Sequence, residues 1–245
     1  MKRTTQVLAA LTTVALGAGV VIGIRNKPNG SQYLVQNSNS AQSQTGTKQS
    51  TNSFDKKQYS IDDPTSIWIV VNKRRPLSPK AYVPSDLTSV GSGQSIRTVA
   101  AAAYQQLVAA ASKAGYTLIP ESGYRSYATQ TSVYGNEVSK YGQSKADFES
   151  ARPGYSEHQT GWAIDIASPG CLEDCFGTTE AAKWVLAHAS TYGFIRRYAP
   201  DKSAITGYRN EPWHFRYVGP ELATELGKTG QTLEEFFGLP AASSY

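Results

Sequence analysis

Residues 162–167 read WAIDIA and residues 213–218 read WHFRYV, and both stretches alternate as half-buried β-strands do. In the first stretch, Asp165 lies on the face away from the isoleucines. In the second, His214 lies on the face away from the aromatic residues. Each strand is therefore predicted to bury one face and to present a metal-competent side chain on the other.

Helical periodicity around these strands predicts an α+β fold, in which helices pack against one small antiparallel sheet that carries the metal-competent residues. Glycine and proline mark most of the boundaries, and Ser95 is the expected cap of the first helix. The expected elements are a strand at 66–71 (SIWIVV), an irregular, proline-interrupted stretch at 72–86, a helix at 95–114, a short strand at 116–119, helices at 127–141 and 178–192, and short helices at 220–226 and 233–237.

The histidines indicate a metal site. The chain has only three, and His158 and His214 lie in polar and aromatic surroundings at the two predicted strands, whereas His188 falls within a helix and is assigned to packing or the surface. Two imidazoles and the carboxylate of Asp165 leave one position of a tetrahedral zinc ion free for water, as a hydrolytic site requires. This donor set favours zinc, although cobalt or nickel would accept the same geometry.

Two further residues would complete hydrolytic chemistry. Glu211, three residues before His214, is placed to take a proton from water and return it to a leaving amine. Arg125 in SGYRS would stabilise the oxyanion that develops on a peptide carbonyl. Trp213, beside both Glu211 and His214, is a candidate substrate contact and equally a core residue. Taken singly, each residue has an ordinary structural explanation, but together they favour a site.

Three blocks of sequence carry a family resemblance. SGYRSYATQ at 122–130, RPGYSEHQTGWAIDI at 152–166 and EPWHFRYVG at 211–219 resemble the signature blocks of the VanY-type D-alanyl-D-alanine carboxypeptidases. That group of zinc peptidases also includes lysostaphin-type endopeptidases and hedgehog domains. The resemblance implies a zinc-bearing antiparallel sheet flanked by helices, over residues 68–237.

Transferred residue by residue, the resemblance implies a complete site. It places the zinc ligands at His158, Asp165 and His214, the catalytic residues at Glu211 and Arg125, and the expected substrate contacts at Ser156, Gln130, Trp213, Tyr124 and Tyr155. Two departures leave the shape of the substrate cleft open: Trp162 stands where a smaller aliphatic residue is usual, and the insert CLEDC follows at 171–175.

The chain is expected to contain three segments. Residues 1–27 hold an uncharged run between basic flanks, which predicts a membrane anchor or a signal segment with the remainder outside the cytoplasm. Residues 28–60 are polar and predict a flexible linker, and 61–240 is the predicted zinc D,D-carboxypeptidase domain. Outside the cytoplasm, Cys171 and Cys175 favour a loop-closing disulfide over metal or redox roles.

The expected function is zinc-dependent removal of the terminal D-alanine from peptidoglycan stem peptides, by a monomer that meets the membrane only through its N-terminal segment. The net charge of +5 accompanies no nucleic-acid motif, so no nucleic-acid partner is expected. An L,D-carboxypeptidase acting on the tetrapeptide is an alternative. A non-catalytic wall-binding module is an alternative of another class, but a purely structural metal site has no use for a base such as Glu211.

Overall fold

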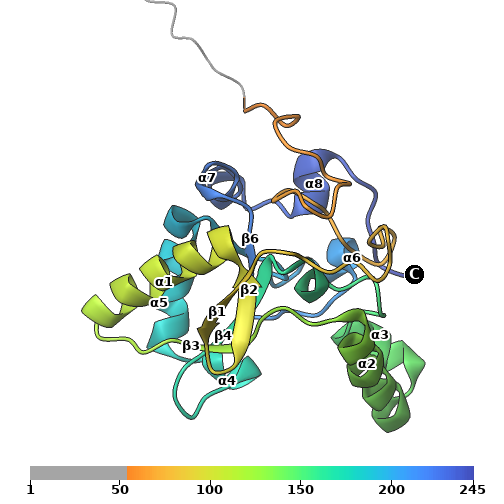
Figure 1. Cartoon of the computed structure of the whole chain (residues 1–245), viewed down its shortest axis with the longest axis horizontal. Coiled ribbons are helices and arrows are strands. Elements are labelled where there is room, and N and C mark those ends of the chain that lie inside the picture. Colours follow the sequence, from red (N-terminus) through yellow and green to blue (C-terminus); the bar gives the residue numbers. More distant parts are fainter. Residues whose placement is uncertain (1–53) are drawn as a thin grey trace, which may run out of the picture. The chain divides into compact units, whose positions relative to one another are not determined.

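The structure is a computed structural model that describes residues 54–245. The predicted anchor at 1–27, and the linker as far as residue 53, lie outside the described residues. The described part has the predicted α+β fold (Figure 1). Its strands are β1 (Leu87–Gly91), β2 (Gln94–Arg97), β3 (Ile119–Ser122), β4 (Ala163–Ala167), β5 (Phe194–Arg196) and β6 (His214–Tyr217). Its helices are α1 (Thr98–Lys113), α2 (Tyr127–Tyr141), α3 (Gln143–Glu149), the 3-10 turn η1 (Glu157–Thr160), α4 (Glu173–Phe176), α5 (Glu180–His188), the 3-10 turn η2 (Ala189–Tyr192), α6 (Ser203–Thr206), α7 (Pro220–Thr229) and α8 (Leu233–Phe237).

A four-stranded antiparallel sheet with the order β3-β4-β6-β5 brings distant parts of the chain together. The register sets Asp165 of β4 directly opposite His214 of β6, and Ile164 opposite Phe215. Directly opposed residues of an antiparallel pair have β-carbons about 4.5–5.5 Å apart. The strand pairing by itself therefore brings two of the predicted metal ligands within reach of each other.

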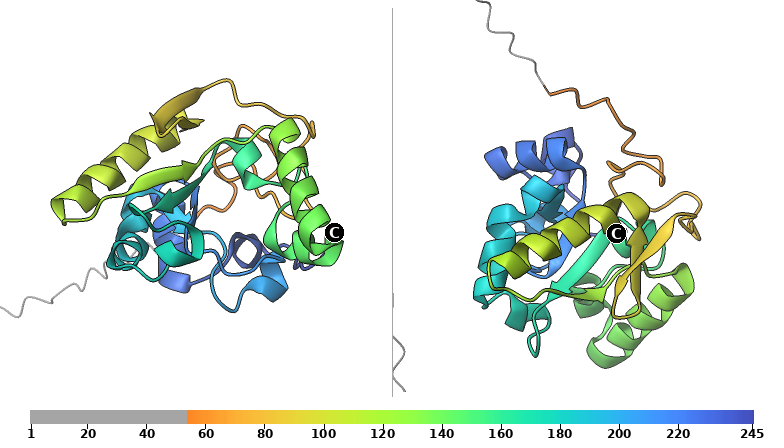
Figure 2. Two further views of the ribbon diagram at one scale, coloured as in Figure 1. Left: turned by 90° about the horizontal axis from the view of Figure 1, so that it is seen from below. Right: turned by 60° about the vertical axis from the view of Figure 1, so that its left-hand side comes forward.

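The main apolar core holds these strands in place. Ile164, Ile166 and Phe215 have no exposed surface and belong to one cluster with Leu107 of α1 and Val185 of α5. Burial of a side chain of this size contributes about 1.5–3 kcal/mol. Helices α1 and α5 lie on one side of the molecule and the α2–α3 hairpin on the opposite side, in Figure 1 and in the left view of Figure 2.

Most of the predicted elements are confirmed. Helix α2 has the predicted bounds and is capped by Ser126, whose hydroxyl accepts the Thr129 N–H at 3.1 Å. Strands β4 and β6, the helical stretch of α5 and η2, and the starts of α7 and α8 also lie where the sequence predicts. The disulfide between Cys171 and Cys175 forms, and His188 stacks on Trp184 at the end of α5.

The strand predicted at 66–71 is wrong. This stretch is irregular, although Trp68, Ile69 and Val70 are each no more than 2% exposed. Its carbonyl groups bond to arginines instead of to a neighbouring strand: Arg216 donates to the Ile67 and Ile69 oxygens, and Arg75 donates to the Val70 oxygen. The β-branched residues of this stretch therefore indicate burial in the core and not strand pairing.

The helix predicted at 95–114 begins later than expected. Residues 95–97 belong to the β1–β2 hairpin, and α1 starts at Thr98. Ser95 does not cap the helix because it pairs with Ser89, while its carbonyl accepts the Tyr124 N–H at 2.7 Å. The strand predicted at 116–119 is displaced in the same direction and forms as β3.

A second apolar cluster forms around Trp68, α7 and α8. Phe54 stacks on Trp68 and meets Phe236 edge-on, with ring centroids 5.4 Å apart in both cases. Packing thus begins at Phe54, within the stretch that the sequence assigns to the linker. Between residues 54 and 245, no helix is both long and apolar enough to span a bilayer.

Candidate metal centre and active-site cleft

Three side chains from separate elements converge on one point. His158 comes from η1, Asp165 from β4 and His214 from β6, and all three are at least 92% buried. Asp165 Oδ2 lies 3.2 Å from His158 Nε2, and Asp165 Oδ1 lies 3.0 Å from His214 Nδ1. Their potential ligand atoms all lie within 4.8 Å of one another.

The three side chains fit a zinc ion. Donors bound at about 2.0–2.1 Å in a tetrahedron are about 3.3 Å apart, close to the separations from Asp165 to the two imidazoles. Asp165 Oδ1 is buried without a hydrogen-bond partner, although His214 Nδ1 lies 3.0 Å away. Nitrogen and oxygen atoms that face a common point without bonding to each other are arranged as ligands are.

Each imidazole is oriented by a bond on its other nitrogen. His158 Nδ1 donates to the Gly123 carbonyl at 2.8 Å, which leaves Nε2 free to bind a metal. His214 Nε2 faces Glu157 Oε2 at 3.4 Å, which leaves Nδ1 free. Such partners fix the tautomer and the direction of a ligating histidine.

Glu157 belongs to a buried charge network that the sequence did not single out. Its Oε1 accepts from Arg197 Nε and from Arg216 Nη1, each at 2.9 Å, and Arg197 also binds Glu234. None of these four side chains has any exposed surface. The one available signal was position, because Glu157 adjoins His158 and Arg216 shares a strand face with His214.

Opposed charges set the protonation of the network and the ligands. Burial alone would lower the pKa of His214, but Asp165 and Glu157 outweigh it and raise this pKa to about 10. Burial would raise the pKa of Glu157, but Arg197 and Arg216 hold it well below its usual range. Asp165 is likewise kept ionised, because His158 and His214 lower its pKa against the effect of burial. The carboxylates that hold a proton on His214 would equally favour a metal ion in place of that proton.

Glu211 lies beside the three candidate ligands. Its Oε2 is 3.8 Å from His214 Nδ1, and its backbone N–H donates to the Tyr198 carbonyl at 3.0 Å. Burial raises the pKa of Glu211 to about 8, and the nearby Asp165 adds to this effect while His214 opposes it. A carboxyl group with this pKa can both accept and donate a proton near neutral pH.

Arg125 is fixed at the start of α2. Its Nη1 donates to Gln130 Oε1 at 3.1 Å and its Nη2 to Ser122 Oγ at 2.7 Å, while its backbone N–H donates to the His158 carbonyl. Gln130 is 1% exposed and uses its amide nitrogen on the Ala151 carbonyl at 2.7 Å. Gln130 therefore holds Arg125 in the direction of the candidate ligands.

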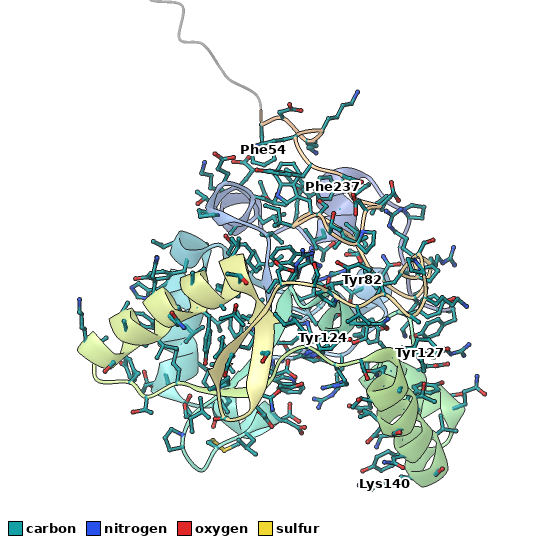
Figure 3. All side chains as sticks on the ribbon, in the orientation of Figure 1. Phe54, Tyr82, Tyr124, Tyr127, Lys140 and Phe237 are labelled. Atoms are coloured by element: carbon teal, nitrogen blue, oxygen red, sulfur yellow. A yellow bond between two sulfur atoms is a disulfide. The ribbon has the colours of Figure 1, made fainter. Side chains whose placement is uncertain are left out.

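The site opens into a cleft of about 490 Å³. Of the residues predicted from sequence, the cleft wall includes all three ligands, both catalytic candidates, and Ser156, Gln130 and Trp213. The same wall continues along α2 and α3, where Lys140 lies near the outer end of α2 (Figure 3).

Two predicted substrate contacts have no place in this wall. Tyr155 packs edge-on against Tyr245, with ring centroids 5.1 Å apart. Tyr124 uses its backbone N–H on Ser95 and lies just before α2 (Figure 3). The cleft is instead lined by three tyrosines that the sequence did not identify as site residues, Tyr141, Tyr198 and Tyr208.

Comparison with known proteins finds one matching family model, described as VanY: D-alanyl-D-alanine carboxypeptidase, over residues 93–220. The putative carboxypeptidase YodJ of Bacillus subtilis is 44% identical over 189 residues, which are 72% of this chain and 69% of that protein. A D-alanyl-D-alanine carboxypeptidase of Enterococcus faecalis is 38% identical over 69% of this chain and just under two thirds (64%) of its own length.

Two solved structures are similar in both sequence and fold. The LdcB LD-carboxypeptidase matches with a TM-score of 0.67 and 44% identity, over 71% of this chain and 87% of the other. A variant of the vancomycin-resistance D,D-pentapeptidase VanY, in complex with Zn(II), matches with a TM-score of 0.63 and 36% identity, over 70% of this chain and 98% of the other. Proteins similar to this chain thus include both D,D- and LD-carboxypeptidases.

Proposed function

The chain belongs to the VanY family of D-alanyl-D-alanine carboxypeptidases, and we propose that it is a zinc enzyme that removes the terminal D-alanine from peptidoglycan stem peptides. The observation that carries this proposal is the convergence of His158, Asp165 and His214 in a cleft beside the buried Glu211. We further propose that it acts as a monomer outside the cytoplasm, attached through residues 1–27.

The residues of the cleft divide the chemistry among them. Zinc held by the two histidines and Asp165 would polarise the scissile carbonyl and make water more acidic. Glu211 accepts the proton of the attacking water and delivers it to the amine of the leaving D-alanine, since its carboxylate lies in the cleft wall 3.8 Å from His214 Nδ1.

A second group of residues orients the substrate. Arg125 offers a fixed positive charge at the cleft wall for the oxygen that gains charge during attack. Gln130 limits the movement of its guanidinium, so this charge is preorganised. Ser156, which is buried and lines the cleft next to η1, is placed to donate to the terminal residue of the substrate.

Replacing Glu211 by glutamine tests the proposal. We expect Glu211→Gln to lower kcat by about 10²- to 10⁴-fold, since general acid–base catalysis contributes on that order. Zinc content, measured by atomic emission, should stay at the parent value. Glu137→Gln is a matched control, because Glu137 also lines the cleft but lies on α2 away from the ligands. A Glu211→Gln enzyme that works at the parent rate removes the base assignment.

Two substrates are candidates. The family description favours a stem pentapeptide ending in D-Ala-D-Ala, whereas the 44% identity to an LD-carboxypeptidase, against 36% to the D,D-pentapeptidase, favours the tetrapeptide. Mass spectrometry of the products from each peptide decides between them. Loss of one alanine from the pentapeptide alone establishes D,D activity, and loss from the tetrapeptide alone establishes L,D activity. Cleavage of neither by the zinc-loaded protein would favour a wall-binding module.

A further inference from the structure

The disulfide-closed insert at 171–175 forms part of the cleft wall. Cys171 and Cys175 join the two ends of the insert, and α4 begins inside it. Glu173 lines the cleft and has a φ of +48°, a backbone conformation that is uncommon for residues other than glycine. Asp174, inside the closed loop, accepts a hydrogen bond from Arg209.

Arg209 connects this insert to the opposite wall. Its Nη1 lies 2.9 and 3.1 Å from the two carboxylate oxygens of Asp174. The same guanidinium forms an ion pair with Glu149 at the end of α3, and the Arg209 backbone N–H donates to the Phe148 carbonyl. The guanidinium also stacks 4.7 Å from the centre of the Trp213 ring. One side chain thus contacts the insert, α3 and the segment that carries Glu211.

A second contact joins the insert to that segment directly. Pro212, the neighbour of Glu211, packs against Gly177 at the end of α4. A β-carbon at Gly177 would lie 2.8 Å from Pro212 Cβ, closer than real β-carbon contacts, so only glycine permits this approach. Residues 209–213 are therefore held from both sides, by Arg209 and by Pro212.

We propose that Arg209 and the disulfide-closed insert at 171–175 form a support that positions Glu211 and Trp213 in the cleft. Arg209 also lines the cleft, but we assign it as a positioning residue because its guanidinium is held by Asp174, Glu149 and the Trp213 ring. An ion pair with an exposed carboxylate such as Asp174 adds little to the free energy of unfolding. We therefore expect the loss of Arg209 to change the position of Glu211 more than the stability of the fold. A displacement of about 1 Å in a catalytic group costs about 10²-fold in rate. The activity readout of this inference rests on the proposed function.

Substitution of Arg209 in the full-length chain tests the support. We expect Arg209→Met to lower kcat by about 10- to 100-fold, with zinc content unchanged and the melting temperature within about 3 °C of the parent. Arg209→Lys keeps the positive charge but lacks the planar guanidinium that binds two carboxylates at once. Its kcat should therefore stay at least about 5-fold below that of the parent. Full activity in the lysine variant, or loss of zinc from the methionine variant, overturns the inference.

Removing the disulfide tests whether the insert at 171–175 is part of this support. We expect the double variant Cys171→Ser, Cys175→Ser to lose about as much kcat as Arg209→Met. The triple variant, which combines the two serine substitutions with Arg209→Met, should have a kcat only slightly lower than either, because both changes disable the same support. Glu180→Gln is the control, since Glu180 is an exposed carboxylate in an ion pair with Lys183, on α5. Parent kcat in the serine variant, or losses that multiply in the triple variant, would show that the insert does not act through Arg209.

Hydrogen exchange separates this inference from the proposed function. The backbone amides of residues 209–211 and of Trp213 should exchange faster in Arg209→Met and in the serine variant than in the parent, whatever peptide the protein cleaves. If the parent cleaves neither stem peptide but exchange rises as expected, the proposed function fails and the support stands. Unchanged exchange in both variants refutes the support.

Discussion

Replacing Glu157 by glutamine should weaken both the fold and the metal site. Glu157 is fully buried and contacts Arg197, Arg216 and His214. Glutamine keeps the size of the side chain and an acceptor oxygen but removes the negative charge. The variant therefore tests charge balance with little change in packing.

The size of the effect follows from the partners that remain. In the parent, the carboxylates of Glu157 and Glu234 balance the guanidiniums of Arg197 and Arg216. After the substitution Arg197 keeps Glu234, but Arg216 loses the carboxylate that it binds and is left with neutral oxygen acceptors. Leaving a buried charge without its partner costs about 3–5 kcal/mol. Loss of the carboxylate behind His214 should also weaken zinc binding by about 10- to 100-fold.

Unfolding by guanidinium chloride in the presence of a chelator measures the free energy of unfolding without any contribution from bound metal. Competition with a fluorescent zinc indicator measures the affinity. Glu234→Gln is the matched control, because it also removes a buried carboxylate from Arg197 but does not touch His214. It should destabilise the fold while leaving zinc affinity within about 3-fold of the parent. A Glu157→Gln protein within about 1 kcal/mol of the parent, or equal losses of zinc affinity in both variants, would refute the reasoning.

Three further outcomes are expected. Burial alone would raise the pKa of Glu234 but Arg197 lowers it, so the contribution of this carboxylate to stability is present above the unfolded pKa of about 4.3 and is lost as the pH falls from there through the lowered folded pKa. Between pH 7 and about pH 3, the free energy of unfolding should therefore fall more in the parent than in Glu234→Gln. Gln130→Ala should lower kcat/KM about 10-fold with zinc retained, because Arg125 loses an acceptor, whereas the exposed Ser132→Ala should have no effect. Chelation should abolish cleavage and lower the melting temperature by about 5 °C, and zinc but not magnesium should restore both.

The proximity of Asp165 and His214 was predictable because local pattern and strand register agree. The alternation in residues 162–167 and 213–218 puts Asp165 and His214 on the polar faces of their strands, and antiparallel pairing then opposes them. Glu211 follows from its spacing to His214. These inferences need only short stretches of sequence, which is why they survive in the structure.

The same local reasoning fails for residues 66–71 and for Glu157, and it fails for one reason. Arginine is rarely buried, and a sequence read alone therefore predicts Arg216 at the surface. In the structure Arg216 is fully buried and donates to the carbonyl groups of Ile67 and Ile69. Such pairing joins residues about 150 positions apart and depends on the folded arrangement. It also has a consequence for function. Since Arg216 binds Glu157, and Glu157 orients His214, the irregular apolar stretch at 66–71 is linked to the metal centre through one continuous set of buried charges.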